Sequence, residues 1–334
     1  MFGKMMNRYY YGKSGKGDFH KEDLPETRWQ LFWEMLRVRF SALTRLNLMY
    51  MVVWIPALIV IGRGVMLCFN GLNAMMEAEN QLTAGLLTQE AAVEQIQTLR
   101  SLLEGVVMQT LLYLFPCIAI TGPVTAGVTY VTRNWARDEH AFIWGDLKDA
   151  TKSNWKYGLL TSVITGFMPL MMYLSNYYYG QMAQNQVLFM VPQVLCLMLG
   201  CIWFLMLFYM YPLMVTYTLK YKDVLRNALL LSIAKLPMNV LLRVITLVPA
   251  LIAAAVSFFF GYAIHAALIL GLYYVVLGYT LSRFISVSYV NGVFDKYINT
   301  KIEGAQVNRG LYTEDDDDED LDEQEEIEAE SEEA

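Results

Sequence analysis

The sequence contains few of the residues that catalytic and metal sites use. Its 334 residues include three histidines, which lie far apart along the chain, and four cysteines. These cysteines form no CxxC pair and have no ligand spacing with a histidine, so we interpret them as small core residues. The HExxH, paired-carboxylate and nucleophile-elbow patterns are also missing. We therefore expect a protein that is not an enzyme and has no catalytic residue, bound metal or cofactor.

Ionisable residues are missing from the middle of the long apolar stretches. Inside a membrane, such side chains mark proton relays, ion sites and voltage sensors. Their absence argues against proton-coupled or sodium-coupled transport, against voltage sensing and against hydrolysis within a membrane.

Apolar residues, in contrast, dominate the composition. Hydrophobic residues make up 56% of the chain, and the mean hydropathy is +0.34. A bilayer core about 30 Å thick needs about 20 apolar residues in a helix. Six stretches are long enough, at 46–67, 108–131, 157–175, 189–217, 243–262 and 265–283. The sequence predicts an all-α, polytopic membrane bundle whose six transmembrane helices form three hairpins.

Positive charges are sorted by position between these stretches. Nine lysines and arginines precede the first stretch, and five, five and four more lie in every second connection. Only Arg63 and Arg100 lie on the other side. Because lysine and arginine near membrane helices stay on the inner side, we expect a bacterial cell-membrane protein with both termini in the cytoplasm. Its inner face should contact the anionic lipids of the inner leaflet.

The net charge of −7 hides this positive body. Residues 314–333 hold 15 of the 32 acidic residues and no basic one, so residues 1–313 carry 25 basic and 17 acidic side chains. Like charges in that tail repel each other, and it has too few apolar residues for a core. We expect a flexible basic segment at 1–27, a membrane domain at 28–300 and a disordered acidic cytoplasmic tail at 301–334.

A short amphipathic segment with basic residues precedes each odd-numbered stretch, near 29–45, 142–155 and 224–236. We expect each segment to lie on the cytoplasmic face as an elbow helix that turns into a span. Together with the hairpins, this pattern predicts three repeats, at 24–140, 141–227 and 228–300.

Matched offsets from two prolines support the repeat. Arg133 and Arg137 follow Pro123 by 10 and 14 residues. At the same offsets, Pro212 is followed by Lys222 and Arg226. We therefore interpret these four basic residues as candidate contacts for a cytoplasmic partner or for lipid headgroups.

The longer outer loop, at 70–104, is acidic on balance. We expect a helix within it that begins after Thr88, whose hydroxyl suits the N-cap position. One apolar face of that helix could pack on the spans or bind a partner.

Threonines form the most regular polar line within an apolar stretch. Thr121, Thr125, Thr129 and Thr132 share one face of the second span beside Pro123, and Thr161 and Thr165 in the third span could face them. As a functional site, these hydroxyls would line a polar path. As structural residues, they would bond to helix carbonyls and join neighbouring helices.

The connection at 133–156, RNWARDEHAFIWGDLKDATKSNWK, is dense in charges and aromatic rings. Its three tryptophans suit the belt that aromatic residues form at a membrane interface. The same residues could instead dock a soluble partner.

Three segments resemble the YesL family of bacterial membrane proteins, which is defined by a domain of unknown function. They are ITGPVTAGVTYVTRNWARDEHAFIWGDLKDATKSNWKYGLL at 120–160, YPLMVTYTLKYKDVLRNALLLSIAKLP at 211–237 and VNGVFDKYI at 290–298. The resemblance covers about residues 28–300 and implies the same membrane topology. It also implies a role beside carbohydrate uptake transporters or two-component sensors, and it provides no functional residues.

From these observations we expect a non-enzymatic plasma-membrane accessory or regulatory protein. The expected partner is a subunit of a carbohydrate ABC transporter or a sensor kinase, and no nucleic-acid partner is expected. The alternative is a facilitator or channel for a small polar solute or a lipid.

Overall fold

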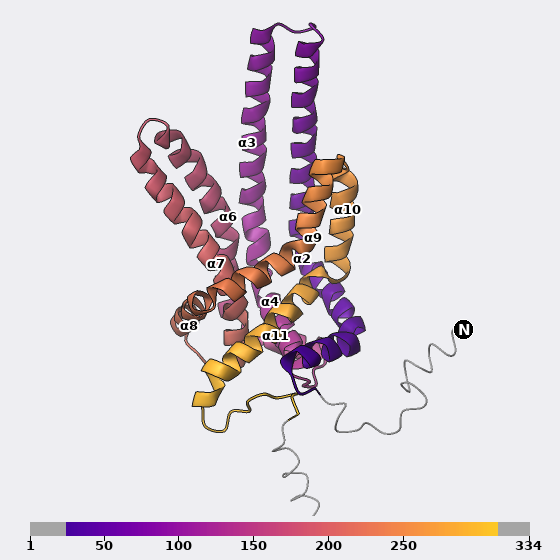
Figure 1. Cartoon of the computed structure of the whole chain (residues 1–334), viewed down its shortest axis with the longest axis vertical. Coiled ribbons are helices and arrows are strands. Elements are labelled where there is room, and N and C mark those ends of the chain that lie inside the picture. Colours follow the sequence, from indigo (N-terminus) through magenta and orange to yellow (C-terminus); the bar gives the residue numbers. More distant parts are fainter. Residues whose placement is uncertain (1–24, 313–334) are drawn as a thin grey trace, which may run out of the picture.

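A computed structural model describes residues 25–312, and in these residues every regular element is helical (Figure 1). The α-helices are α2 (Arg28–Thr83), α3 (Gln89–Ala119), α4 (Gly122–Trp135), α5 (Ile143–Ser153), α6 (Trp155–Ala183), α7 (Met190–Thr216), α8 (Tyr221–Ala234), α9 (Leu236–Phe260), α10 (Ala263–Tyr273) and α11 (Tyr279–Tyr297). A π-helical turn, Tyr274–Gly278, joins α10 to α11. The all-α class is confirmed. The predicted segment at 1–27 and the acidic tail lie mostly outside the described residues.

Six helical runs within residues 25–312 are long and apolar enough to cross a membrane. They are α2, α3, α6, α7 with the turn before it, α9, and the run from Ala263 to Lys301. This number agrees with the six stretches predicted from hydropathy. The fold is therefore that of a multi-pass membrane protein.

Three pairs of these helices lie side by side as arms that rise from a shared base (Figure 1). The pairs are α2 with α3, α6 with α7, and α9 with α10. Short helices precede two of the arms. The helix α5 packs on α4 and comes just before α6, and α8 packs on α7 and comes just before α9. The first amphipathic segment, in contrast, is continuous with α2. That these short helices lie on a membrane surface stays a prediction.

The predicted outer loop at 70–104 is mostly helical, so the true loop is shorter than predicted. The helix α2 continues to Thr83, and α3 begins at Gln89, so only a short turn joins them. Thr88 is the N-cap of α3, and its hydroxyl accepts a hydrogen bond from the Ala91 amide at 3.4 Å, as predicted. The segment forms helix because alanine, methionine, leucine and glutamate, all good helix formers, outweigh its single glycine before the turn, Gly71.

The predicted second span is not one helix. α3 ends at Ala119, and α4 begins at Gly122 with Pro123 in its first turn. Proline lacks the backbone N–H that a helix interior needs, but the first turn of a helix does not use that N–H. Pro123 therefore begins a new helix, and α4 lies at the base of the bundle in contact with α2, α5, α6, α7 and α11.

The helix of the predicted fifth span, α9, starts earlier than the apolar stretch. This helix begins at Leu236, before the predicted start at residue 243, and so includes Arg243 in its first half. The guanidinium of Arg243 lies 4.1 Å from the centre of the Phe208 ring and donates to the Phe204 carbonyl. Arg283, near the start of α11, lies 5.2 Å from the ring of Tyr211.

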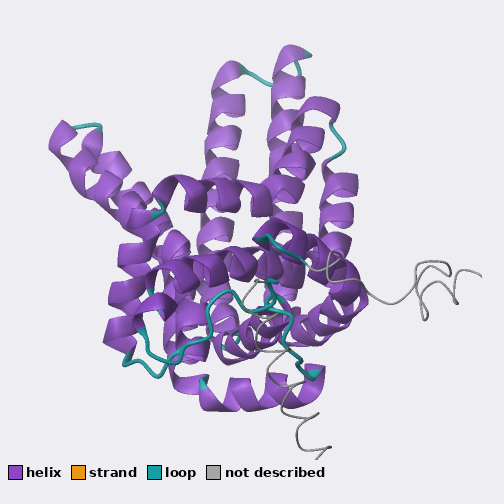
Figure 2. Ribbon diagram, turned by 60° about the horizontal axis from the view of Figure 1, so that its bottom comes forward, coloured by secondary structure: helices purple, strands orange, loops and turns teal. Residues whose placement is uncertain are grey.

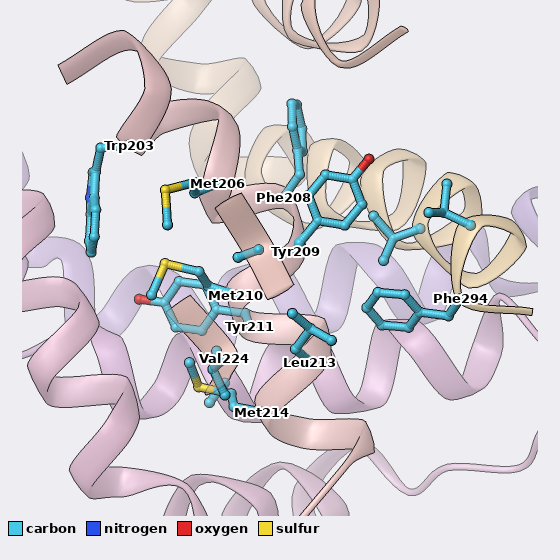
Figure 3. Packing of buried hydrophobic residues seen from close by; sticks show 14 of the residues in the cluster. Trp203, Met206, Phe208, Tyr209, Met210, Tyr211, Leu213, Met214, Val224 and Phe294 are labelled. Carbon is cyan, nitrogen blue, oxygen red and sulfur yellow. The ribbon is translucent and has the colours of Figure 1, made fainter. Parts of the chain in front are cut away.

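The core lies at the base, where the arms converge. One apolar cluster surrounds the second half of α7 and includes Tyr209, Leu213 and Phe294 (Figure 3). A second cluster joins α2, α4 and α11 through residues such as Leu43, Val131 and Phe284. Side chains on all sides of α7 are buried from Phe208 to Met214, as expected for a helix at the centre of a bundle.

Candidate functional site

The threonines of α4 are buried, and their hydroxyls bond to the chain itself. Thr125 and Thr129 donate to the carbonyls of Thr121 and Thr125, at 2.9 Å and 2.7 Å. Thr121 donates to Ile118 at 2.8 Å. The Tyr50 hydroxyl also lies 2.6 Å from that of Thr125, which ties α2 to α4. Each of these hydroxyls therefore satisfies its hydrogen bonding within the bundle.

The threonines of α6 join that helix to its neighbours. The Thr161 hydroxyl lies 3.2 Å from that of Tyr221, and Thr165 accepts a hydrogen bond from the indole of Trp203 at 3.1 Å. α4 and α6 meet where Gly122 faces Gly158, so their backbones approach closely. These contacts match the structural interpretation of the threonines, and a polar path along them stays a prediction.

The segment after α11 crosses the end of the bundle that is lower in Figure 1. Charged and amide side chains from the ends of α4 and α11 lie close to this segment. Figure 2 brings this end forward and shows loops that run between the helix ends. We call this set the basal cluster. It consists of Arg28, Arg133, Arg137, Glu139, Asp295 and Asn299.

Two of the three arginines of this cluster come from the end of α4. Arg133 is in its last turn, and Arg137 follows the helix just before Asp138, whose φ of 55° turns the chain back. They are 9% and 8% exposed. Both line a cavity of about 300 Å³. Its other lining residues are Glu139, Asn299 and the segment from Gly304 to Gln306.

Asp295, in the last turns of α11, organises the other half of the cluster. Its carboxylate accepts hydrogen bonds from Arg28 at 2.6 Å and from the Asn299 amide at 2.5 Å. The backbone N–H of Asn308 donates to it at 3.3 Å. Asn299 in turn accepts from the Tyr217 hydroxyl at 2.6 Å. Asp295 is 4% exposed, and three donors offset the cost of burying its charge.

Arg133 has no such partner. Within residues 25–312 no carboxylate lies within 4.0 Å of its guanidinium, which donates to the Asn134 side chain at 3.2 Å. Its Nε is buried without a hydrogen-bond partner in the same part of the chain. Burial lowers the pKa of Arg133 below its ordinary value, and the positive charge of Arg137 lowers it further. The cluster therefore holds a positive charge that the described chain does not neutralise.

Lys222 and Arg226 are placed differently. Both are exposed on α8, whereas Arg133 and Arg137 are buried at the base. The four basic residues predicted as one set therefore occupy two environments. Whether either pair contacts a partner or a headgroup stays a prediction.

Several residues of the basal cluster were not singled out from the sequence. Asp295 is in the last turns of α11, and Asn299 lies just after its end. An acidic residue directly after an apolar helical run was the available signal. Arg28, whose ion pair with Asp295 spans 267 positions, gave no local signal of this pairing.

Aromatic side chains are exposed at the turn between α4 and α5. Phe142 and Trp144 are each 67% exposed, and Trp155, at the start of α6, is also exposed. The opposite face of α5 is buried, because Leu147 and Ala150 pack beneath it. The helix thus presents its rings outward.

The six apolar helices and this polar base define the class as a multi-pass membrane protein. Comparisons with protein-family models, curated proteins and solved structures gave no match. The YesL resemblance is thus untested by them and stays a prediction.

Proposed function

We propose that this chain is a non-enzymatic accessory or regulatory protein of the bacterial cell membrane, with both termini in the cytoplasm. Following the YesL resemblance, we propose that it associates with a carbohydrate ABC transporter or with a sensor kinase subunit. The observation that supports this function is the exposure of three aromatic side chains along α5 and at its ends, those of Phe142, Trp144 and Trp155. Exposed aromatic residues grouped on one surface are typical of binding sites.

The neighbouring structure supports docking at this surface. α5 is fixed from beneath, since the main chain at Leu147 lies so close to Gly127 of α4 that no Cβ would fit there. A rigid helix loses little conformational entropy when a partner binds its outer face. The alternative role for these rings, as anchors among lipid headgroups, needs no partner.

Crosslinking in cells followed by affinity purification separates the two roles. The wild-type chain is expected to retain a transporter or sensor subunit, and a double substitution of Phe142→Ala and Trp144→Ala is expected to lose it. Phe260→Ala, at a similarly exposed ring at the end of α9, is the matched control and should retain the partner. If the wild-type chain is always recovered alone, the accessory function is wrong.

A facilitator for a small polar solute or a lipid is the second candidate. It is supported by Arg243 and Arg283, because charged residues inside membrane helices commonly mark solute paths. Arg283 lies beside the ring of Tyr211, which neighbours the paired hydroxyls of Tyr50 and Thr125.

Flux into reconstituted vesicles tests the facilitator. Thr125→Leu should block flux of the transported solute. Thr98→Leu, at an exposed site in the first half of α3, should leave this flux unchanged. Wild-type vesicles that are no leakier than empty ones to a panel of sugars and ions would remove this candidate.

A further inference from the structure

We propose that Arg133 and Arg137 form a binding site for a phosphate-type oxyanion, supplied either as free phosphate or as the phosphate of a lipid headgroup. The site is the 300 Å³ cavity of the basal cluster. It does not depend on the docking surface or on the accessory function.

Arg133 has N–H donors that the described chain leaves without an acceptor. A guanidinium has five N–H donors and no acceptor. Within the described chain, Arg133 makes one side-chain hydrogen bond, to Asn134, and its buried Nε makes none. Leaving a charged donor buried and unpaired costs free energy, which a bound anion would recover.

The charges around the cavity are positive on balance. Glu139 is the carboxylate of the cavity lining, and it lies 3.4 Å from the Nε of Arg137 and 3.4 Å from that of Arg309. Two guanidinium groups thus share one carboxylate, and Arg133 stands beside them without one of its own. Asp295 is already engaged by Arg28, Asn299 and Asn308. The positive excess at the cavity is therefore not offset by a neighbouring acid of the described chain.

The geometry fits a polyatomic anion better than a cation or an apolar ligand. Arginine binds phosphate and carboxylate through two parallel N–H donors, and two arginines on one cavity provide more than one such fork. The volume is several times the roughly 30 Å³ that one water molecule occupies in the liquid. Polar side chains, including those of Arg133, Glu139 and Asn299, line the cavity.

The test uses the purified full chain in detergent micelles. Inorganic phosphate is titrated by calorimetry, and lipid binding is counted by native mass spectrometry with phosphatidylglycerol or with diacylglycerol, which lacks the phosphate. We expect wild-type protein to bind inorganic phosphate, phosphatidylglycerol or both, and to bind diacylglycerol no better than background. Phosphate alone would assign a free anion, and phosphatidylglycerol alone would assign a headgroup.

Substitutions locate the site. Arg133→Gln is expected to weaken binding at least about tenfold, because a charged hydrogen-bonding group is lost. Arg133→Lys keeps the charge but loses the fork and should weaken binding less. Arg100→Gln is the control, at an exposed arginine of α3 outside the basal cluster, and should bind as wild type does.

Thermal unfolding of each variant confirms that it is folded, and Arg137→Gln replaces Arg133→Gln if the latter does not fold. Two results would overturn the site. One is wild-type protein that binds neither probe, and the other is binding that survives both arginine substitutions.

Discussion

The two pairs of basic residues that follow Pro123 and Pro212 have the same spacing and opposite environments. Arg133 and Arg137 are buried beside a polar cavity, whereas Lys222 and Arg226 are exposed. The difference begins at the prolines. Pro123 is in the first turn of α4, so the helix extends beyond it toward Arg133, but Pro212 is in the last turns of α7.

After Pro212 the chain leaves the helix and becomes extended at Tyr217, and α8 begins at Tyr221. Lys222 is therefore in the first turn of α8, while Arg133 is in the last turn of α4. Equal spacing along the sequence thus does not produce equal structure when the helix boundaries differ. The threefold repeat stays a prediction, but its matched basic residues are not structurally equivalent.

The largest expected effect is at the contact that holds α4 in place. In Gly122→Ala, the new Cβ would lie 2.1 Å from the Gly158 carbonyl oxygen and 2.2 Å from the Ser162 hydroxyl. Because backbone cannot yield as a flexible side chain does, we expect a loss of about 3 kcal/mol in the free energy of unfolding. Chemical unfolding in detergent measures this loss.

Gly145→Ala is the control, because its Cβ would meet nothing closer than 3.9 Å. That substitution should leave stability unchanged or raise it by up to about 1 kcal/mol, since alanine favours helix. Equal effects at the two glycines would show that close packing of α4 on α6 does not fix the buried position of Arg133.

A smaller loss is expected when the acid of the basal cluster is neutralised. Asp295→Asn removes a charge that accepts hydrogen bonds from Arg28, Asn299 and Asn308. We expect a loss of about 2 kcal/mol in the same unfolding measurement, a typical value for bonds to a charged group. Arg28 is partly exposed, so water limits the loss.

The exposed region provides the comparison. Asp223→Asn, in the first turn of α8 beside Lys222, should cost less than about 1 kcal/mol, the usual value of an acid near a helix N-terminus. A greater loss for Asp223→Asn than for Asp295→Asn would reverse the proposed difference between the two regions.

The smallest effect concerns pH. Burial raises the pKa of the Tyr217 hydroxyl from 10.0 to about 12. Between these values the unfolded chain releases the proton and the folded chain keeps it, so rising pH removes stability across that window. Tyr217→Phe should flatten this part of the dependence, and at neutral pH it should cost about 1 kcal/mol through the lost bond to Asn299.

Unfolding at a series of pH values from 9 to about 12 measures the slope, with Tyr178→Phe, at an exposed tyrosine of α6, as the control. An unchanged slope in Tyr217→Phe would mean that this hydroxyl does not titrate differently in the folded chain.

Local patterns predicted the elements better than their ends. The N-cap Thr88 and the helices near 142–155 and 224–236 follow from side chains a few residues apart, and the structure has a helix at each place. The break between Ala119 and Gly122 was not predicted, because apolar residues on both sides of it form one predicted stretch. Pro123 was compatible with a bent helix as well as with a new one.

The sequence predicted only part of the candidate site. Arg133 and Arg137 were selected for their charge, but nothing local distinguished them from Lys222 and Arg226. The partners that surround the cavity, such as Asn299 and Gln306, come from the far end of the chain. Such a site cannot be assembled from spacing, because it depends on where distant segments meet.

The sequence by itself determined that the chain forms long apolar helices and how many of them can span a membrane. It could do so because an apolar run in lipid must satisfy its own backbone hydrogen bonds, and a helix does this locally. The tertiary structure alone decided which charges are buried. Arg28 meets Asp295 across 267 positions, and Arg133 lines a cavity without an ion-pair partner of its own in the described chain, because helix packing rather than sequence distance brings side chains together.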